Sequence, residues 1–207
     1  PLSLLNAMNT PPEKNALNAE QQKAFDEISA NLGTGRCHLL YGVTGSGKTH
    51  VFLSLIDKVL AEGKSALLLL PEISLTFQVV NRFCSYYGKK VALLHSGLSK
   101  GEKSDEWERI QRGEATVVIG TRSAVFAPVK NLGIIIIDEE QEHTYKSEMT
   151  PKYHAREIAA YRAANEKALL LLASATPSFE SFTRRRAELS GFLPLQDAII
   201  CSRCRKS

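Results

Sequence analysis

The sequence lacks long hydrophobic runs, and its first 183 residues lack any excess of charge. No apolar stretch approaches the roughly 20 residues that a membrane-spanning helix needs, so no membrane-spanning helix is expected. Six of the 26 basic residues and two of the 22 acidic residues lie in residues 184–207, which leaves 20 of each sign in residues 1–183. A neutral body has no broad basic surface, so any contact with nucleic acid is expected to be local.

Cysteine is also scarce, with Cys37, Cys84, Cys201 and Cys204 alone in 207 residues. The first two fall in apolar segments, which favours buried thiols in a reducing compartment over disulfides. The last two form a C-x-x-C pair without the second pair of ligands that a structural zinc site needs, so zinc binding is not expected. Residues 1–10 show neither a basic start nor a cleavage-like site, and no signal peptide is expected. The predicted compartment is the cytoplasm.

What the sequence does contain is a complete phosphate-loop pattern, G-x-x-x-x-G-K-[ST]. An apolar run at residues 37–41 precedes it, and a stretch with helical periodicity follows it. Glycine lets such a loop point successive backbone N–H groups at a polyphosphate, and the helix adds the positive end of its dipole. The flanking strand and helix disfavour the alternative of a glycine-rich turn without a ligand. The predicted nucleotide-binding residues of the loop are Gly42, Val43, Thr44, Gly45, Ser46, Gly47, Lys48 and Thr49.

Two side chains of this loop have distinct expected roles. The Lys48 ammonium would reach the β- and γ-phosphates of a nucleoside triphosphate. The Thr49 hydroxyl would ligate Mg²⁺. Together they predict that the chain binds a nucleoside triphosphate with its metal.

The rest of the chain alternates between apolar runs and amphipathic stretches. Asn18 is expected to cap a helix that ends near Ala30. Further strands are predicted at residues 66–70, 91–94, 116–119, 134–137 and 169–172, and further helices at residues 75–86, 100–111 and 154–164. Because strands this uniformly apolar are covered on both faces, the predicted fold class is α/β, a mostly parallel sheet with helices on both faces. Residues 1–16, rich in Pro, Asn and Thr, are expected to form a leading arm.

Acidic residues follow the apolar run Ile134–Ile137 directly, in the order Asp138, Glu139, Glu140, Gln141. Because the carboxyl ends of parallel strands share an edge, these residues are expected to lie beside the phosphate loop. Asp138 would hold Mg²⁺, directly or through water, and Glu139 would orient and deprotonate an attacking water. A pair of solvated loop carboxylates is the alternative, and the phosphate loop 90 residues upstream makes it less attractive.

The phosphate loop, the D-E-E-Q box and the triplet Ser174-Ala175-Thr176 occur in the order found in the helicases and translocases of superfamily 2. Within it, residues 17–182 resemble the PriA family of primosomal DNA helicases. The segments P-E-I-S-L-T at 71–76 and G-T-R-S-A-V-F-A-P at 120–128 carry the resemblance most specifically. The resemblance implies a RecA-like P-loop NTPase domain at residues 17–183, the first lobe of an ATP-dependent DNA helicase in replication restart (primosome assembly).

The resemblance also implies roles around the nucleotide. Gln21 would read the adenine base, with Gln22 as the second choice, because an amide donates and accepts hydrogen bonds along the adenine edge. Gln141 stands where many relatives have His and would bridge the γ-phosphate to the triplet of Ser174 and Thr176, which would couple hydrolysis to movement. The implied catalytic residues are Lys48, Thr49, Asp138, Glu139 and Gln141.

Single-stranded or forked DNA is the implied partner, together with other primosome proteins and single-strand-binding protein, and no membrane. Backbone amides, hydroxyls and an arginine are suitable partners for phosphates, and tyrosines for stacked bases. Arg122 could equally be an ordinary surface arginine, and Tyr145 and Tyr153 ordinary half-buried tyrosines. The implied DNA-binding residues are Pro71, Glu72, Thr76, Thr121, Arg122, Ser123, Tyr145, Lys146 and Tyr153.

Residues 184–207 do not match the family pattern and are expected to be a non-family tail or a truncation. The resemblance implies a second lobe with an arginine finger, a group typically worth about 10³-fold or more in the rate of phosphoryl transfer. Without it, the chain is expected to bind ATP·Mg²⁺ weakly and to hydrolyse it poorly. Two alternatives remain: another superfamily 2 DNA translocase of the RecG-like or repair type, and a non-catalytic nucleotide-binding fragment.

Overall fold

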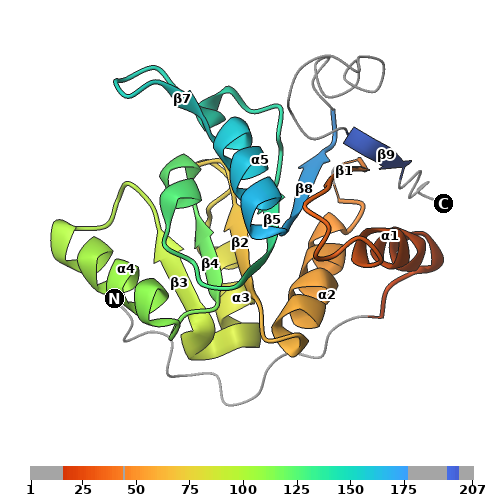
Figure 1. The fold of residues 1–207 in the computed structure, drawn as a ribbon, viewed down its shortest axis with the longest axis horizontal. Helices are drawn as coiled ribbons and strands as arrows, with labels where there is room; N and C mark the ends of the chain where they lie inside the picture. The colour runs from red at the N-terminus through yellow and green to blue at the C-terminus, as the bar shows by residue number, and fades with distance from the viewer. Residues whose placement is uncertain (1–15, 44, 177–194, 201–207) are drawn as a thin grey trace.

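Seven parallel strands form the sheet of the computed structural model, which describes residues 16–43, 45–176 and 195–200 (Figure 1). The strand order is β3-β4-β2-β5-β8-β1-β9, and every neighbouring pair is parallel. A separate antiparallel hairpin is formed by β6 (Lys146–Ser147) and β7 (Tyr153–His154). The strands of the sheet are β1 (Cys37–Tyr41), β2 (Ser65–Leu69), β3 (Val91–Leu94), β4 (Val117–Gly120), β5 (Leu132–Ile137), β8 (Leu169–Ser174) and β9 (Leu195–Ile200).

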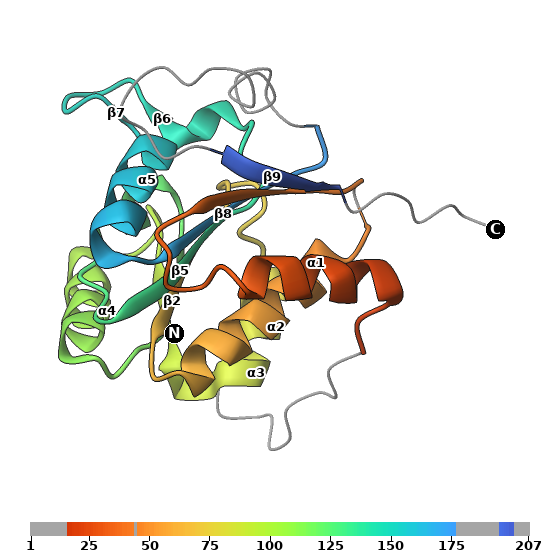
Figure 2. The same ribbon diagram turned by 45° about the vertical axis from the view of Figure 1, so that its right-hand side comes forward.

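Helices cover both faces of the sheet, as the sequence predicts. One face carries α1, α2 and α3, and the other carries α4, α5 and the 3₁₀ turn η3 (Figure 2). Each predicted span is present, with ends that differ by a few residues at most. No helix among the described residues is long and apolar enough to cross a membrane. The bounds are α1 (Ala19–Ser29), α2 (Lys48–Ala61), α3 (Phe77–Tyr87), η2 (Gly88–Lys90), α4 (Lys100–Arg112), η3 (Arg122–Phe126), η4 (His143–Tyr145) and α5 (Ala155–Glu166).

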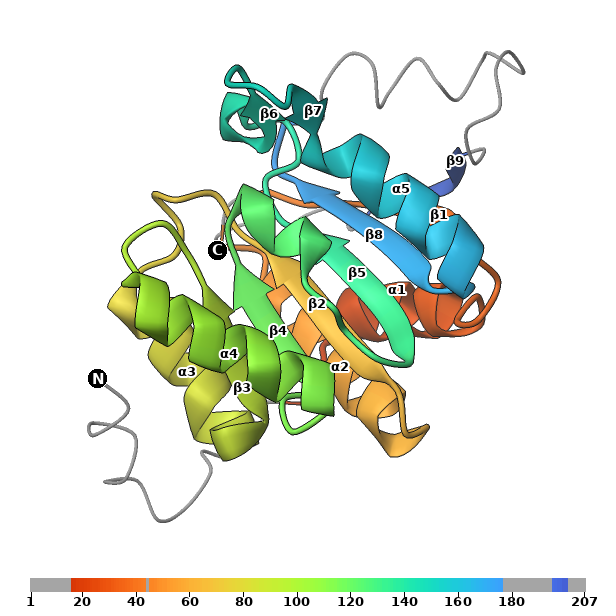
Figure 3. The same cartoon turned by 60° about the vertical axis from the view of Figure 1, so that its left-hand side comes forward.

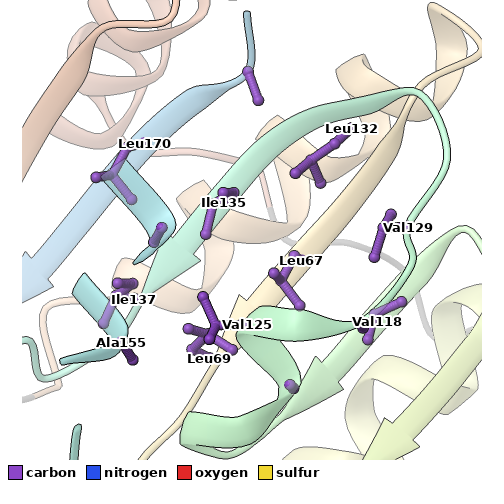
Figure 4. Packing of buried hydrophobic residues seen from close by; sticks show 14 of the residues in the cluster. Leu67, Leu69, Val118, Val125, Val129, Leu132, Ile135, Ile137, Ala155 and Leu170 are labelled. Atoms are coloured by element: carbon purple, nitrogen blue, oxygen red, sulfur yellow. The ribbon is translucent and has the colours of Figure 1, made fainter. Parts of the chain in front are cut away.

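The central strands are apolar along most of their length because successive side chains enter two different cores. In β2, Leu68 packs with α1, α2 and α3, whereas its neighbours Leu67 and Leu69 pack with η3 and α5. In β5, Ile134 and Ile136 face the first layer, and Ile135 and Ile137 face the second (Figure 4). Each fully buried aliphatic side chain of this kind contributes about 1.5–3 kcal/mol to folding.

The first helix begins at the residue that the sequence indicates. Asn18 is the N-cap of α1, and its side-chain oxygen accepts a hydrogen bond of 2.8 Å from the Gln21 backbone N–H. The Gln21 side-chain oxygen in turn accepts a bond of 3.0 Å from the Asn18 N–H, so the two residues form a capping box.

One strand lies where the sequence analysis assigned no element. β9 falls within residues 184–207 and pairs with β1 in parallel, so it forms one edge of the sheet. The domain boundary at residue 183 remains a prediction. Residues 1–15 of the leading arm predicted at residues 1–16, like Cys201 and Cys204, lie outside the described residues.

Candidate functional site

The carboxyl ends of five strands bring the informative segments of the sequence to one edge of the sheet. Because all strands of the sheet are parallel, the segments that follow them must meet there. Backbone hydrogen bonds join neighbouring ends: the Gly42 N–H donates to the Ser174 carbonyl at 3.1 Å, and the Asp138 N–H donates to the Leu69 carbonyl at 3.0 Å. The residues at or just after these strand ends are Gly42 (β1), Pro71 (β2), Thr121 (β4), Asp138 (β5) and Ser174 (β8).

The phosphate loop has the backbone that a polyphosphate cradle requires. Gly45 and Gly47 both have a φ of 81°, in the left-handed region that glycine adopts without strain. Gly47 caps α2 without a side chain, and a Cβ at this position would overlap the Gln21 side chain. The Ser46 hydroxyl is buried without a hydrogen-bond partner among the described residues. The loop therefore fits a phosphate ligand; Thr44 lies outside the described residues.

Lys48 links this loop to the acidic box. Its ammonium donates a hydrogen bond of 2.8 Å to the Gly42 carbonyl and lies 3.7 Å from a carboxylate oxygen of Glu139. The side chain is only 9% exposed, and that of Glu139 is 25% exposed. The cation is thus held over the loop, between its carbonyl and the Glu139 carboxylate, and its role at the phosphates stays a prediction.

Asp138 and Glu139 sit side by side in a partly buried position at the end of β5. Burial, reinforced by the neighbouring Glu139 carboxylate, raises the pKa of Asp138 from 3.8 to about 6. Lys48 and the hydrogen bond from the Glu139 N–H, at 3.0 Å, oppose this rise. Because burial removes water from the ionised carboxylate, a cation bound beside it would stabilise the charged form.

When no metal is bound, the burial of the ionised Asp138 carboxylate should measurably lower the free energy of unfolding. Since the pKa of Asp138 is raised on folding, stability from this group is present near pH 3.8 and is lost as the pH rises through about 6. The rise of about two pKa units corresponds to at most about 3 kcal/mol. Asp138→Asn should therefore raise the free energy of unfolding in EDTA at about pH 7.5, with a gain that shrinks toward pH 3.8. Urea titrations at both pH values test this. Equal stability of Asp138→Asn and the wild type at the higher pH would contradict it, and Asp105→Asn, exposed on α4, is the control.

Gln141 connects the acidic box to the triplet at the end of β8. Its amide nitrogen donates to a Glu139 carboxylate oxygen at 2.8 Å, and its amide oxygen accepts a bond of 2.5 Å from the Ser174 hydroxyl. The Thr176 N–H donates to the same hydroxyl at 2.9 Å. A continuous polar chain therefore runs from Lys48 through Glu139, Gln141 and Ser174 to Thr176.

The oxygens at the predicted magnesium position suit that ion. Thr49 occupies the second position of α2 and is half-buried, and Asp138 offers a carboxylate at the end of β5, on the same edge of the sheet. Mg²⁺ commonly takes one or two protein oxygens and completes its shell with waters and substrate phosphates. In the part of the chain that the structure describes, no cluster of three or more His, Cys, Asp or Glu side chains competes for a metal.

Gln21 has a different environment from the one predicted for an adenine-reading residue. It is 6% exposed, and its amide nitrogen donates to the Ser46 carbonyl at 3.0 Å. Its oxygen is engaged in the capping box of α1. Both ends of the amide thus serve protein contacts, and Gln21 ties α1 to the phosphate loop. The second choice, Gln22, is exposed and bonds to Asp26 at 2.8 Å.

Tyr145, predicted to stack on DNA, is buried in this structure. Only 1% of it is exposed, and its hydroxyl lies 2.7 Å from the Asp138 carbonyl and 3.1 Å from the Leu69 carbonyl. Burial raises the pKa of Tyr145 above its ordinary value, so the hydroxyl stays protonated and donates. The expectation of a stacking surface is wrong for this conformation, because the ring fills the core beneath the acidic box.

Arg122 also uses its donors within the protein. One guanidinium nitrogen donates to the Thr144 carbonyl at 3.1 Å and to the Lys146 carbonyl at 2.5 Å. The guanidinium lies 5.9 Å from the centre of the half-buried Tyr153 ring, which meets Phe126 edge to face at 4.9 Å. If Arg122 contacts a DNA phosphate as predicted, that contact would compete with the hydrogen bonds from its guanidinium to the Thr144 and Lys146 carbonyls.

The remaining predicted DNA-binding residues divide by exposure. Pro71 and Thr121 are buried, so their side chains are not presented to a ligand in this structure. The Thr76 hydroxyl accepts a bond of 3.4 Å from the Val79 N–H as the N-cap of α3, and Lys146 pairs with Glu148 at 3.0 Å. Exposed side chains are those of Glu72, Thr76, Ser123 and Lys146.

Sequence reasoning missed a buried ion pair at the acidic box. The Glu140 carboxylate lies 3.1 Å from the Arg156 guanidinium, and the two side chains are 0% and 11% exposed. The signal was present, because a carboxylate directly after a buried strand requires a cation to remain charged. Its partner, 16 residues away in the first turn of α5, was not apparent from spacing alone.

The parallel sheet, the phosphate loop and the acidic residues beside it define an ATP-hydrolase-type domain of the P-loop NTPase class, with a RecA-like fold. A family model described as DEAD/DEAH box helicase matches residues 18–184. The chain belongs to this helicase family.

Individual relatives narrow the comparison. The chain is 51% identical over 185 residues to the replication restart protein PriA of Bacillus subtilis (strain 168), covering 88% of this chain and 23% of that protein. It is 50% identical over 167 residues to PriA of Treponema pallidum (strain Nichols), covering 81% and 25%. A structure of RecG bound to a three-way DNA junction is 28% identical with a TM-score of 0.59, covering 82% of this chain and 22% of that one. The chain spans about a quarter of the length of these curated relatives.

Proposed function

We propose that this chain is the ATP-binding first lobe of an ATP-dependent DNA helicase of the PriA type that acts in replication restart. The observation that carries the proposal is the polar chain from Lys48 through Glu139 and Gln141 to Ser174. This chain of contacts joins the phosphate loop to the end of β8. A change at the nucleotide could therefore alter the position of the Ser174–Thr176 triplet, which in the proposed whole enzyme leads toward a second lobe.

The residues of the site would divide the work of hydrolysis. Backbone N–H groups of the phosphate loop and the Lys48 ammonium would bind the phosphates of ATP. Glu139, held in this structure by Lys48 and Gln141, would orient a water and take its proton. Thr49 and Asp138 would hold Mg²⁺, which neutralises charge on the phosphates when bound. Gln141 and Ser174 would hold the Glu139 carboxylate in place, and their contacts would change when that carboxylate moves.

Single-stranded or forked DNA is the proposed partner, met by exposed side chains and backbone of the segments after β2 and β4. Other primosome proteins, single-strand-binding protein and a cytoplasmic location belong to the same proposal. A RecG-like translocase is the second candidate, and identities of 51% and 50% to PriA proteins, against 28% to RecG, favour the PriA type. The domain limits at residues 17 and 183 are part of the proposal.

The test is to measure ATP binding and hydrolysis by this chain with and without a single-stranded oligonucleotide. A fluorescent ATP analogue should bind in the presence of Mg²⁺, and turnover by residues 1–207 alone should be low, because the arginine finger that the proposal assigns to a second lobe is typically worth about 10³-fold or more in rate. Addition of a second lobe should then restore turnover that rises with DNA. Failure to bind ATP would refute the proposed function. Strong DNA-stimulated turnover by the chain alone would refute its dependence on a second lobe, and binding that no second lobe converts into turnover would favour the non-catalytic alternative.

A further inference from the structure

The residue proposed as the general base has an unusual backbone conformation. Glu139 has a φ of 47°, in the left-handed region, which costs a non-glycine residue about 1–2 kcal/mol. Two other described non-glycine residues share it, Asn131 and Lys167, and Lys167 is the C-cap of α5, where this conformation is common. Glu139 ends no helix. Strain of this kind persists only where the surrounding structure imposes it.

The residues on either side of Glu139 are both fixed. The Asp138 N–H donates to the Leu69 carbonyl of β2, and the Glu140 N–H donates to the Ala173 carbonyl of β8. These strands lie on opposite sides of β5, whereas residues two apart in a regular strand donate to the same neighbour, so the chain crosses from one neighbour to the other where a regular strand would not. The left-handed turn at Glu139 makes this crossing.

The buried ion pair secures the second of these fixed points. The Glu140 carboxylate is 0% exposed and lies 3.1 Å from Arg156, whose side chain is 11% exposed. A buried carboxylate without a cation is strongly unfavourable, so Glu140 stays where Arg156 is. Arg156 is itself placed by α5, which packs on β5 and β8 (Figure 3). The position of residue 140 is therefore set by a helix that borders the site.

We propose that Arg156 is a positioning residue for hydrolysis, which acts through Glu140 to keep Glu139 in the left-handed conformation. In that conformation the Glu139 carboxylate lies against Lys48 and accepts from Gln141. Without the pair, residue 140 loses its side-chain anchor and its hold on the Ala173 carbonyl weakens, so that Glu139 relaxes to an ordinary conformation that turns its carboxylate away. The effect on hydrolysis rests on the proposed function, whereas the effect on the Glu139 backbone does not.

The variants must remove the pair without leaving a buried charge. Removal of one partner alone is strongly destabilising, whereas replacement of both by neutral side chains of similar size is often tolerated. The main variant is therefore Glu140→Gln/Arg156→Met. Arg156→Lys is the second variant, because it keeps the charge but has a shorter side chain without the guanidinium fork, which weakens the contact. The matched control is Glu106→Gln/Arg109→Met, which removes another partly buried pair at 2.8 Å on α4.

The first measurement is the backbone conformation of Glu139 by NMR, from its φ-sensitive coupling and carbon shifts in the nucleotide-free chain. The left-handed signature should be present in the wild type and in the Glu106/Arg109 control. It should be lost in Glu140→Gln/Arg156→Met and intermediate in Arg156→Lys. Retention of the signature in the double variant would overturn the proposal. If the double variant does not fold, a signature unchanged in Arg156→Lys overturns it instead.

The second measurement separates binding from chemistry. With the chain in excess over ATP, single-turnover hydrolysis should fall about 100-fold in the Glu140/Arg156 variant, as expected when a reacting group is displaced by about 1 Å. The Kd for ATP·Mg²⁺ should change less than about 3-fold, since the phosphate loop is untouched. An unchanged rate in a folded variant would contradict the catalytic effect. If the wild type binds no ATP, the proposed function fails, and the NMR result still decides the role of Arg156.

Discussion

Lys48→Ala is expected to abolish measurable ATP binding by this chain. The ammonium is 9% exposed and already spans the Gly42 carbonyl and the Glu139 carboxylate, so it is placed for phosphate before any ligand arrives. Charge-assisted hydrogen bonds are worth about 1.5–3 kcal/mol each, and loss of two to phosphate oxygens amounts to about 100-fold or more in Kd.

Titration of a fluorescent ATP analogue against the wild type and the variant measures this effect. Lys58→Ala is the matched control, because Lys58 lies on the same helix, α2, but is exposed in its last turn. Both variants should unfold at temperatures close to that of the wild type if Lys48 acts mainly on the ligand. A Kd that changes less than about 3-fold in Lys48→Ala would show that the phosphate loop does not bind nucleotide as proposed.

Glu139→Gln is expected to block hydrolysis and to leave ATP binding nearly intact. The amide keeps the size of the side chain but can neither take a proton from water nor form the ion pair with Lys48 at 3.7 Å. Loss of a general base typically lowers a rate about 10²- to 10⁴-fold. Because the phosphate contacts are made by the loop, the binding constant should change far less than the rate.

Single-turnover hydrolysis with the chain in excess is sensitive enough for a slow enzyme and tests this difference directly. Glu142→Gln is the control, since Glu142 is a half-buried carboxylate three residues further along. Equal rates for wild type and Glu139→Gln would remove Glu139 from the role of base. A parallel loss of binding and rate would instead indicate that its main task is to hold Lys48.

Several features of the site were predictable because they depend on short stretches of sequence. The phosphate loop needs glycine at fixed spacing, and its conformation at Gly45 and Gly47 follows from that. The acidic box follows an uninterrupted apolar run, and such a run indicates a strand buried on both faces. Parallel strands then place Asp138 and Lys48 at the same edge, without any knowledge of the detailed packing.

Other features depend on partners that are distant in sequence, and only the tertiary structure decided them. The resemblance implies that Tyr145 stacks on DNA, with a half-buried tyrosine as the alternative, yet its hydroxyl reaches a carbonyl 76 residues away and the ring is buried. Gln21 reads as a base contact, yet it bonds to the phosphate loop 25 residues further on. β9 pairs with a strand near the start of the chain. Periodicity and motifs report local conformation and which strand ends meet, whereas the burial of one polar side chain depends on which distant donor, acceptor or charge packs against it.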